Sequence, residues 1–369
     1  MNRLVALAVP GGPRFVEELR RAWDDGDAVL PLDLRLPPGA IAELLHAMAP
    51  AALVDGDGRS KRPHGIPVEP GDALVVATSG TTGAPKGAVL THAAVAASAE
   101  ATSAYLGVEP ARHRWLACLP LAHVGGLSVL TRALHTGTPV EVHPGFDADA
   151  VMAAARNGAT HVSLVATALK RIDPTVFEKI VLGGGPAPSP RPPNASVTYG
   201  LTETGSGLVY DGRPLPGVEV RVCDGELWVR GPMLLRAYRN GADPKDADGW
   251  LATGDGGEVD PAGGEVRVFG RRSEVINTGA EKVWPGPVER LLAEHPAVAE
   301  AAVVGRPDPE WGQAVTAIVA PADPGSPPSL EQLRAYVRER LSPWHAPRRL
   351  ELVAALPKTS LGKVRRHLL

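Results

Sequence analysis

The residues best suited to chemistry lie in one ten-residue segment, 78–87, which reads TSGTTGAPKG. It contains three glycines, four hydroxyl side chains and one lysine. Backbone N–H groups, hydroxyls and an ammonium group are the donors that a polyphosphate needs, so this composition predicts a phosphate-binding loop. Lys86 is followed by Gly87, where a Walker A loop has Ser or Thr, which excludes that motif. An ordinary Ser/Thr/Gly turn is the competing interpretation.

Four more short motifs follow along the chain: YGLTET at 199–204, TGD at 253–255, GR at 270–271 and PKTSLGK at 357–363. With the loop, and in this order, they resemble the adenylate-forming (ANL) superfamily of acyl-CoA synthetases, luciferases and peptide-synthetase adenylation domains. The resemblance implies that a carboxylate attacks the α-phosphorus of ATP and that pyrophosphate leaves. Such a step needs neutralised phosphate charge and in-line positioning of the attacking group.

The resemblance implies ATP, Mg²⁺ and CoA as cofactors. Glu203 would be the metal ligand, because a hard divalent cation prefers one or two carboxylates together with phosphate oxygens. Lys363 would be the catalytic residue, since a cation between the attacking carboxylate and the α-phosphate stabilises charge mainly in the transition state. The residues expected to bind ATP or AMP are Thr78, Ser79, Gly80, Thr81, Thr82, Lys86, Gly184, Gly185, Tyr199, Thr202, Asp255 and Arg271.

Individual roles in the nucleotide site follow from the same resemblance. Thr202 would bond to the α-phosphate, and Tyr199 would cover the adenine. The glycine pair 184–185 would let the backbone approach that ring, since no Cβ intervenes. Asp255 would accept hydrogen bonds from both ribose hydroxyls, and Arg271 would reach the ribose or a phosphate.

A structural explanation competes with each of these roles. Taken alone, Tyr199 is also typical of a core tyrosine, and the glycine pair and Asp255 of plain turns. Glu203 is equally consistent with a solvated loop acid, and Lys363 with a solvated basic tail.

Three segments bear on the acid substrate: LPLAHVGGL at 119–127, GGGPAP at 183–188 and GLVYDG at 207–212. Only 77 residues precede Thr78, so an abbreviated N-terminal subdomain is expected. Together with this short N-terminal region, the segments resemble the compact actinobacterial o-succinylbenzoate:CoA ligases of menaquinone biosynthesis. The resemblance makes His123 a catalytic or gating residue of an acyl pocket. The residues expected to bind the acid are His123, Ser163, Leu164, Val165, Gly205 and Ser206. A histidine satisfied at a helix start, and purely structural serines, are the alternatives.

Other functions stay open at this point. The chain could be another aryl- or acyl-CoA ligase, or an adenylation domain that loads a carrier protein. A catalytically silent nucleotide-binding homologue is a further alternative, because Ser273 stands where the family hinge commonly has Asp or Lys, and Ala280 replaces a family glycine.

The elements that must position these residues alternate between strand and helix, which predicts an α/β fold. Strands are predicted at 4–10, 74–77, 115–119, 162–165, 179–182 and 197–199, and helices at 93–105 and 123–134. From about 217 the pattern becomes that of half-buried antiparallel strands, at 218–222 and 226–230. An α+β pattern follows, with helices at 286–294 and 329–341 and strands at 299–304, 314–320 and 349–353. We therefore expect a large N-terminal adenylation domain, 1–270, of mixed sheets and helices, and a small mobile C-terminal lid, 271–369.

Composition supports an enzyme that handles small molecules. The 369 residues are 44% hydrophobic, which excludes disorder, and the formal net charge of -3 gives no footprint for nucleic acid. No run approaches the roughly 18 apolar residues of a membrane helix. Cys118 and Cys223 lie far apart, as expected in a reducing compartment, so a cytoplasmic location is predicted. A homodimer is the family-based expectation.

Overall fold

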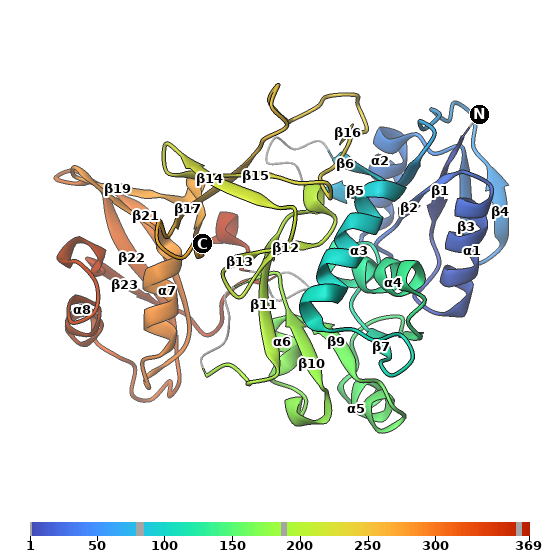
Figure 1. Ribbon diagram of the computed structural model, residues 1–369. Helices are drawn as coiled ribbons and strands as arrows, with labels where there is room; N and C mark the ends of the chain where they lie inside the picture. Colours follow the sequence, from blue (N-terminus) through green and yellow to red (C-terminus); the bar gives the residue numbers. More distant parts are fainter. Residues whose placement is uncertain (1, 79–84, 186–189, 359–363) are drawn as a thin grey trace. The chain divides into compact units, whose positions relative to one another are not determined.

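The computed structural model describes residues 2–78, 85–185, 190–358 and 364–369, which form two compact units (Figure 1). Unit 1 comprises Met1–Gly184, Arg191–Val220 and Val229–Leu251. Unit 2 comprises Gly185–Pro190, Arg221–Trp228 and Ala252–Leu369. The mixed architecture of sheets and helices confirms the predicted fold class. The chain passes between the units more than once, and the single division at 270 stays a prediction.

The first sheet of unit 1 has seven strands in the order β16-β6-β5-β2-β1-β3-β4. Strand β1 (Leu4–Leu7), beside the central β2, is parallel to both of its neighbours and fully buried. It is shorter than the strand predicted at 4–10. The other strands are β2 (Ala28–Pro31), β3 (Ala52–Asp55), β4 (Gly58–Lys61), β5 (Asp72–Thr78), β6 (Lys86–Thr91) and β16 (Ala237–Tyr238).

Strands β5 and β6 flank the predicted phosphate loop. They pair antiparallel, and Thr78 at the end of β5 lies opposite Lys86 at the start of β6. The sequence predicted β5 but not β6, because Lys86 and Gly87 had been assigned to the loop. The pairing therefore places Lys86 on a rigid strand rather than in a turn.

The second sheet of unit 1 also has seven strands, in the order β13-β12-β11-β10-β9-β7-β8. Its strands are β7 (Trp115–Ala117), β8 (Val140–Val142), β9 (His161–Leu164), β10 (Lys179–Leu182), β11 (Ala195–Gly200), β12 (Gly207–Tyr210) and β13 (Arg213–Pro214). The strand predicted at 115–119 is shorter than expected and ends at Ala117.

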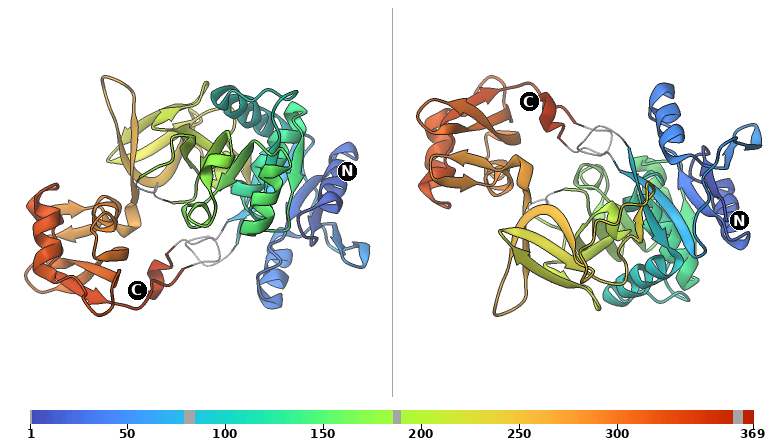
Figure 2. Two further views of the ribbon diagram at one scale, coloured as in Figure 1. Left: turned by 90° about the horizontal axis from the view of Figure 1, so that it is seen from below. Right: turned by 90° about the horizontal axis from the view of Figure 1, so that it is seen from above.

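Two helices, α3 (His92–Leu106) and α4 (Val124–Thr136), lie side by side in Figures 1 and 2. Helix α3 packs on β5 and β6 of the first sheet and on β12 of the second, while α4 packs on β7, β8 and β9. The pair thus forms a helical layer between the two sheets. Thr91 caps α3 by accepting a hydrogen bond from the Ala94 N–H. The remaining helices of unit 1 are α1 (Pro13–Asp24), α2 (Pro38–Met48), α5 (Ala148–Arg156) and α6 (Ala166–Leu169).

A four-stranded sheet, in the order β14-β15-β17-β18, contains three of the points where the chain changes unit. Its strands are β14 (Glu219–Cys223), β15 (Glu226–Arg230), β17 (Leu251–Val259) and β18 (Val266–Arg271). The alternating patterns predicted at 218–222 and 226–230 correspond to β14 and β15.

The rest of unit 2 is the predicted α+β segment, a five-stranded sheet with two helices. Its strands are β19 (Ile276–Thr278), β20 (Glu281–Val283), β21 (Val298–Asp308), β22 (Gly312–Pro321) and β23 (Arg349–Leu352). Helices α7 (Pro285–Ala293) and α8 (Leu330–Arg338) pack against each other, and both contribute to one apolar core with β21 and β22. Ser329 and Gln332 form a capping box at the start of α8. This helix is shorter than the predicted 329–341. In the described ranges, no helix has the length and apolar character needed to cross a membrane.

Candidate functional site

Lys86, Glu203 and Tyr238 come together in unit 1. The Lys86 Nζ atom lies 5.3 Å from the centroid of the Tyr238 ring, and the Tyr238 hydroxyl donates a 2.9 Å hydrogen bond to Glu203 Oε1. Burial, followed by the charge of Glu203, raises the pKa of Tyr238, so this hydroxyl stays a donor. The sequence predicted Lys86 and Glu203 separately, and it missed Tyr238 because a lone tyrosine in a loop segment carries no spacing signal.

Backbone pairing holds this cluster in place. Strand β16 pairs with β6, so Tyr238 lies opposite Ala88. The next residue, Arg239, donates its N–H to the Gly87 carbonyl at 2.7 Å. A Cβ on Gly87 would lie 2.5 Å from Met48 Sδ and 2.7 Å from Val75 Cγ1, so any larger residue would displace these side chains. The Arg239 guanidinium also binds the carbonyl oxygens of Met48, Ile66 and Pro67.

The YGLTET motif forms a strand end and a short 3-10 turn. Tyr199 lies on β11 opposite Val209, and Thr202 and Glu203 begin the turn η2 (Thr202–Thr204). The Leu235 N–H donates to the Glu203 carbonyl at 2.7 Å, which ties the turn to the segment before β16. Of the other predicted nucleotide residues, Thr78 ends β5, and Gly184 follows β10 with a φ of 80°. Ser79, Gly80, Thr81, Thr82 and Lys363, the predicted catalytic residue, lie outside the described residues.

Glu203 fits the expected magnesium chemistry. Within the described ranges, no group of three or more His, Cys, Asp and Glu side chains could hold a metal by itself. A cation that keeps waters and binds one or two carboxylates plus substrate phosphates does not need such a group. A single carboxylate beside Lys86 is therefore an adequate protein contribution.

Asp255 and Arg271 form a second group, in unit 2. They lie opposite each other on β17 and β18, with Arg271 Nε 3.2 Å from Asp255 Oδ1. Arg271 Nη1 also donates to the Thr253 carbonyl at 2.9 Å, and Asp255 is 6% exposed. Gly254, between Thr253 and Asp255 in the TGD motif, has a φ of 72° and donates its N–H to a Glu226 carboxylate oxygen. The two predicted ribose-binding residues therefore contact each other in the structure. Gly185, a predicted adenine-binding residue, belongs to the same unit.

Arg132, a residue that the sequence did not single out, is buried in unit 1. The residue is 3% exposed and lies on α4. Its Nη2 donates to Ser206 Oγ at 3.2 Å, and its guanidinium lies 5.0 Å from the centroid of the Trp115 ring. Nε and Nη1 are buried and find no hydrogen-bond partner in the part of the chain that the structure describes. Burial lowers the pKa of Arg132. A single charge in the apolar run LSVLTRAL is the signal that could have identified it.

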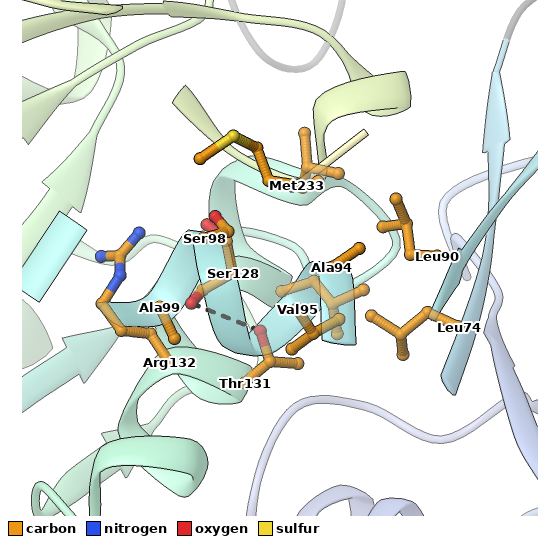
Figure 3. A pocket seen from close by; sticks show the side chains of 13 residues that line it. Leu74, Leu90, Ala94, Val95, Ser98, Ala99, Ser128, Thr131, Arg132 and Met233 are labelled. Carbon is orange, nitrogen blue, oxygen red and sulfur yellow. Dashed lines mark hydrogen bonds between the residues drawn. The ribbon is translucent and has the colours of Figure 1, made fainter. Parts of the chain in front are cut away.

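Arg132 borders a small cavity between α3, α4, β5 and β6 (Figure 3). In Figure 3 its guanidinium lies at one end, near Ser98 and Ser128, and Leu74 and Leu90 lie at the other. The cavity volume is about 10 Å³, which is room for about one water molecule. Gly205, one of the predicted substrate residues, also lines it, and its φ of 65° requires glycine.

His123 is the N-cap residue just before α4, and its ring contacts an aspartate. Its Nε2 atom lies 3.2 Å from Asp33 Oδ2. Arg35 binds the same carboxylate and lowers the pKa of Asp33 to about 2. Burial lowers the pKa of His123 and outweighs the opposing effect of Asp33, so the imidazole is neutral at pH 7. A neutral ring that donates through Nε2 leaves Nδ1 as an acceptor. The gating role stays a prediction.

The other predicted acyl residues separate onto different faces. Leu164 is fully buried in an apolar cluster with Leu116 and Ile180. Ser163 precedes it on β9, so its side chain points to the opposite face of the sheet. Val165 packs against the same cluster as Leu164. Ser163 is itself buried, with 8% of its surface exposed, and the burial of Leu164 argues against a substrate contact.

A larger open cavity, of about 400 Å³, lies within unit 2. Its aromatic residues are Trp311 and Trp344, and three arginines outnumber one glutamate, Glu281. The Arg348 guanidinium stacks 3.9 Å from the centroid of Trp311. The lining residues are Thr278, Ala280, Glu281, Trp311, Arg334, Arg338, Pro343, Trp344, Ala346 and Arg348. Beside it, Gly279 has a φ of 64° and donates its N–H to the Trp311 carbonyl, so this glycine is required. Ala280 has no such backbone demand.

Family models match both parts of the chain. Residues 2–239 match AMP-binding enzyme, and residues 287–363 match AMP-binding enzyme C-terminal domain. The chain therefore belongs to the AMP-binding enzyme family, which confirms the resemblance drawn from its motifs.

The relatives point to one kind of ligase. A "Probable 2-succinylbenzoate--CoA ligase" of Mycobacterium tuberculosis (strain CDC 1551 / Oshkosh) is 42% identical over 319 residues, covering 80% of this chain and 82% of the relative. A 2-succinylbenzoate--CoA ligase of Bacillus velezensis (strain DSM 23117 / BGSC 10A6 / LMG 26770 / FZB42) is 37% identical over 334 residues, covering 80% of this chain and 68% of its own length. The o-succinylbenzoate CoA synthetase (MenE) of Bacillus subtilis, in complex with the acyl-adenylate OSB-AMP, is similar with a TM-score of 0.85 and 28% identity, over 99% of this chain and 87% of that one.

Proposed function

We propose that this protein is an AMP-forming acyl-CoA ligase that converts o-succinylbenzoate, ATP and CoA into o-succinylbenzoyl-CoA, AMP and pyrophosphate through an acyl-adenylate. The ordered motifs, the family and the activity named for its relatives support the reaction class. The observation that carries the choice of acid is Arg132, a buried cation with two nitrogens that have no hydrogen-bond partner among the described residues.

The substrate has two carboxylates, and only one of them is activated. A buried guanidinium without a counter-ion is costly, and a carboxylate that arrives with the ligand offsets that cost. Nε and Nη1 of Arg132 each keep donors without a partner among the described residues, while Nη2 donates one hydrogen bond to Ser206, so a carboxylate would meet charge-assisted donors here. A monocarboxylic acid would leave the guanidinium unpaired. Arg132 therefore favours a dicarboxylic substrate.

In the adenylation step, Lys86 would neutralise phosphate charge. Glu203 would hold Mg²⁺, which supplies Lewis-acid stabilisation of the departing pyrophosphate. Asp255 would orient the ribose, and Lys363 would bridge the carboxylate and the α-phosphate. Lys363→Ala should slow adenylate formation far more than thioester formation from supplied acyl-adenylate, and equal losses in both half-reactions would contradict the assignment.

For the thioester step, the cavity of unit 2 suits the nucleotide end of CoA. Its arginines, Arg334, Arg338 and Arg348, match phosphate groups, and its two tryptophans offer faces for an adenine. We further propose the division into an adenylation domain, 1–270, and a mobile lid, 271–369, a homodimeric assembly and a cytoplasmic location.

A pyrophosphate-release assay tests the proposal directly. Purified protein with Mg²⁺, ATP and CoA should release pyrophosphate with o-succinylbenzoate well above the rates with benzoate or a fatty acid. Mass spectrometry should then detect free acyl-CoA, which an adenylation domain that loads a carrier protein would not release. Release with benzoate or a fatty acid but not with o-succinylbenzoate would overturn the substrate assignment. ATP binding without turnover on any acid would indicate a silent homologue.

A further inference from the structure

We propose that Tyr238 is a positioning residue of the adenylation site, which orients the Glu203 carboxylate toward the metal and keeps the Lys86 ammonium available for phosphate. The inference rests on the proposed function, because that function assigns Mg²⁺ to Glu203 and ATP to Lys86. Tyr238 itself lies in none of the five motifs.

The hydroxyl of Tyr238 acts on the carboxylate. It donates to Glu203 Oε1 at 2.9 Å, and no hydrogen bond to Oε2 is found among the described residues. A hydrogen bond to one oxygen of a metal ligand fixes the orientation of the carboxylate and leaves its other oxygen for the cation. Because burial and the charge of Glu203 raise the pKa of Tyr238, the phenol does not compete as an anion for the metal.

The ring of Tyr238 acts on the lysine. Lys86 Nζ lies 5.3 Å from the ring centroid, and Lys86 forms no ion pair with a carboxylate within the described ranges. A cation–π contact holds an ammonium group without neutralising its charge. Glu203 and Lys86 thus contact opposite parts of one phenol, its hydroxyl and its ring face. A direct ion pair between them would occupy both groups that the nucleotide and the metal need.

The backbone around Tyr238 is anchored independently of these contacts. Strand β16 adds to the edge of the sheet beside β6, the strand that begins with Lys86. Arg239, the residue after Tyr238, donates its backbone N–H to the Gly87 carbonyl. Its guanidinium donates to three carbonyl oxygens of the N-terminal region. The position of the phenol is therefore set by the sheet and does not depend on a ligand.

Two substitutions separate the two contacts. Tyr238→Phe removes the hydroxyl and keeps the ring, and Tyr238→Leu removes both. Calorimetric titration of ATP at a series of Mg²⁺ concentrations, without an acid substrate, is the readout. For Tyr238→Phe we expect the Mg²⁺ concentration at half-maximal ATP affinity to rise about fivefold, with ATP binding in EDTA unchanged. For Tyr238→Leu, ATP binding in EDTA should also weaken, by about threefold.

Tyr105→Phe is a matched control, because the Tyr105 hydroxyl also donates to a carboxylate oxygen, Asp211 Oδ2, at 2.9 Å. It should leave both titrations unchanged, and thermal unfolding of all variants checks that they are folded. An unchanged Mg²⁺ dependence in Tyr238→Phe would overturn the inference. If the dependence shifts as expected but no acyl-CoA forms from any acid, the positioning role stands and the proposed ligase function fails.

Discussion

The Lys86–Tyr238–Glu203 cluster and the Arg132 cavity differ in whether their charged groups have contacts within the protein. In the first, each charged group contacts the same phenol, so the cluster is ordered before any ligand arrives. In the second, a cation is buried while two of its nitrogens find no partner among the described residues. Under the proposed function, phosphate binding would be preassembled, whereas the acid site would store an electrostatic cost that a suitable substrate relieves. Four measurements sharpen or break this contrast.

Glu203→Gln should have the largest effect. The amide still accepts the hydrogen bond from Tyr238 but no longer offers an anionic ligand to Mg²⁺. Loss of several kcal/mol of charge stabilisation corresponds to a fall of roughly 100- to 1,000-fold in the rate of adenylate formation. ATP–pyrophosphate exchange measures that rate. A fall below tenfold, or a large change in the apparent affinity for the acid, would contradict the assignment of Glu203 to the phosphate side.

Arg132→Leu should come next. Removing charge-assisted hydrogen bonds to the second carboxylate should lower kcat/KM for o-succinylbenzoate about 100-fold. The monocarboxylic analogue that keeps only the activated carboxylate should change less than threefold, which is the internal control. Thermal stability should hold or rise, because an unpaired buried charge is removed. Equal losses with both acids would show that Arg132 serves the packing of α4 instead.

Trp115→Phe tests how Arg132 is held. Trp115 is fully buried on β7, and its ring lies under the guanidinium. Phenylalanine keeps an aromatic face but a weaker one, so KM for o-succinylbenzoate should rise about fivefold with kcat nearly unchanged. Trp228→Phe is the matched control, because the Arg221 guanidinium lies a similar 5.3 Å from the centroid of the Trp228 ring. Trp228 does not line the cavity. The same KM change in both variants would refute a specific role for Trp115.

The smallest expected effect is on the pH dependence of the free energy of unfolding, and it comes from His161. Burial, and then the charges of His113, Lys179, Arg132 and Arg112, lower the pKa of His161 to about 4. In the unfolded chain a histidine binds its proton near pH 6.5, so the unfolded state takes up more protons between pH 6.5 and 4.

The free energy of unfolding should therefore fall as the pH drops through this window, and the His161 contribution to that fall should level off below about 4. Chemical denaturation at several pH values measures it, and His161→Phe should flatten the slope. Asp33, whose pKa is lowered to about 2, acts in the same direction only near the lower end of this window, where an aspartate in the unfolded chain begins to bind a proton. A pH-independent wild type would exclude His161 as the source.

Much of the fold could be read from local patterns. The apolar run at Leu4, the helix beginning near Ala93 and the α+β segment after 285 were all predicted. Strand β6 was missed because its first residues also belong to the glycine-rich loop. Helix α8 proved shorter than its pattern, since periodicity marks a helix better than it marks the end of one.

The sequence by itself determined the family, the reaction class and the motif residues, because phosphate and metal chemistry require particular side chains within a few positions of one another. It did not identify Tyr238 or Arg132, and it placed Ser163 and Leu164 together although a strand turns them to opposite faces. Only the tertiary structure brought Tyr238 across from Ala88 and its ring near Lys86, and placed Arg132 beside Trp115 and Ser206. These partners are far apart in sequence, and their roles arise from sheet pairing and burial, which no local spacing encodes.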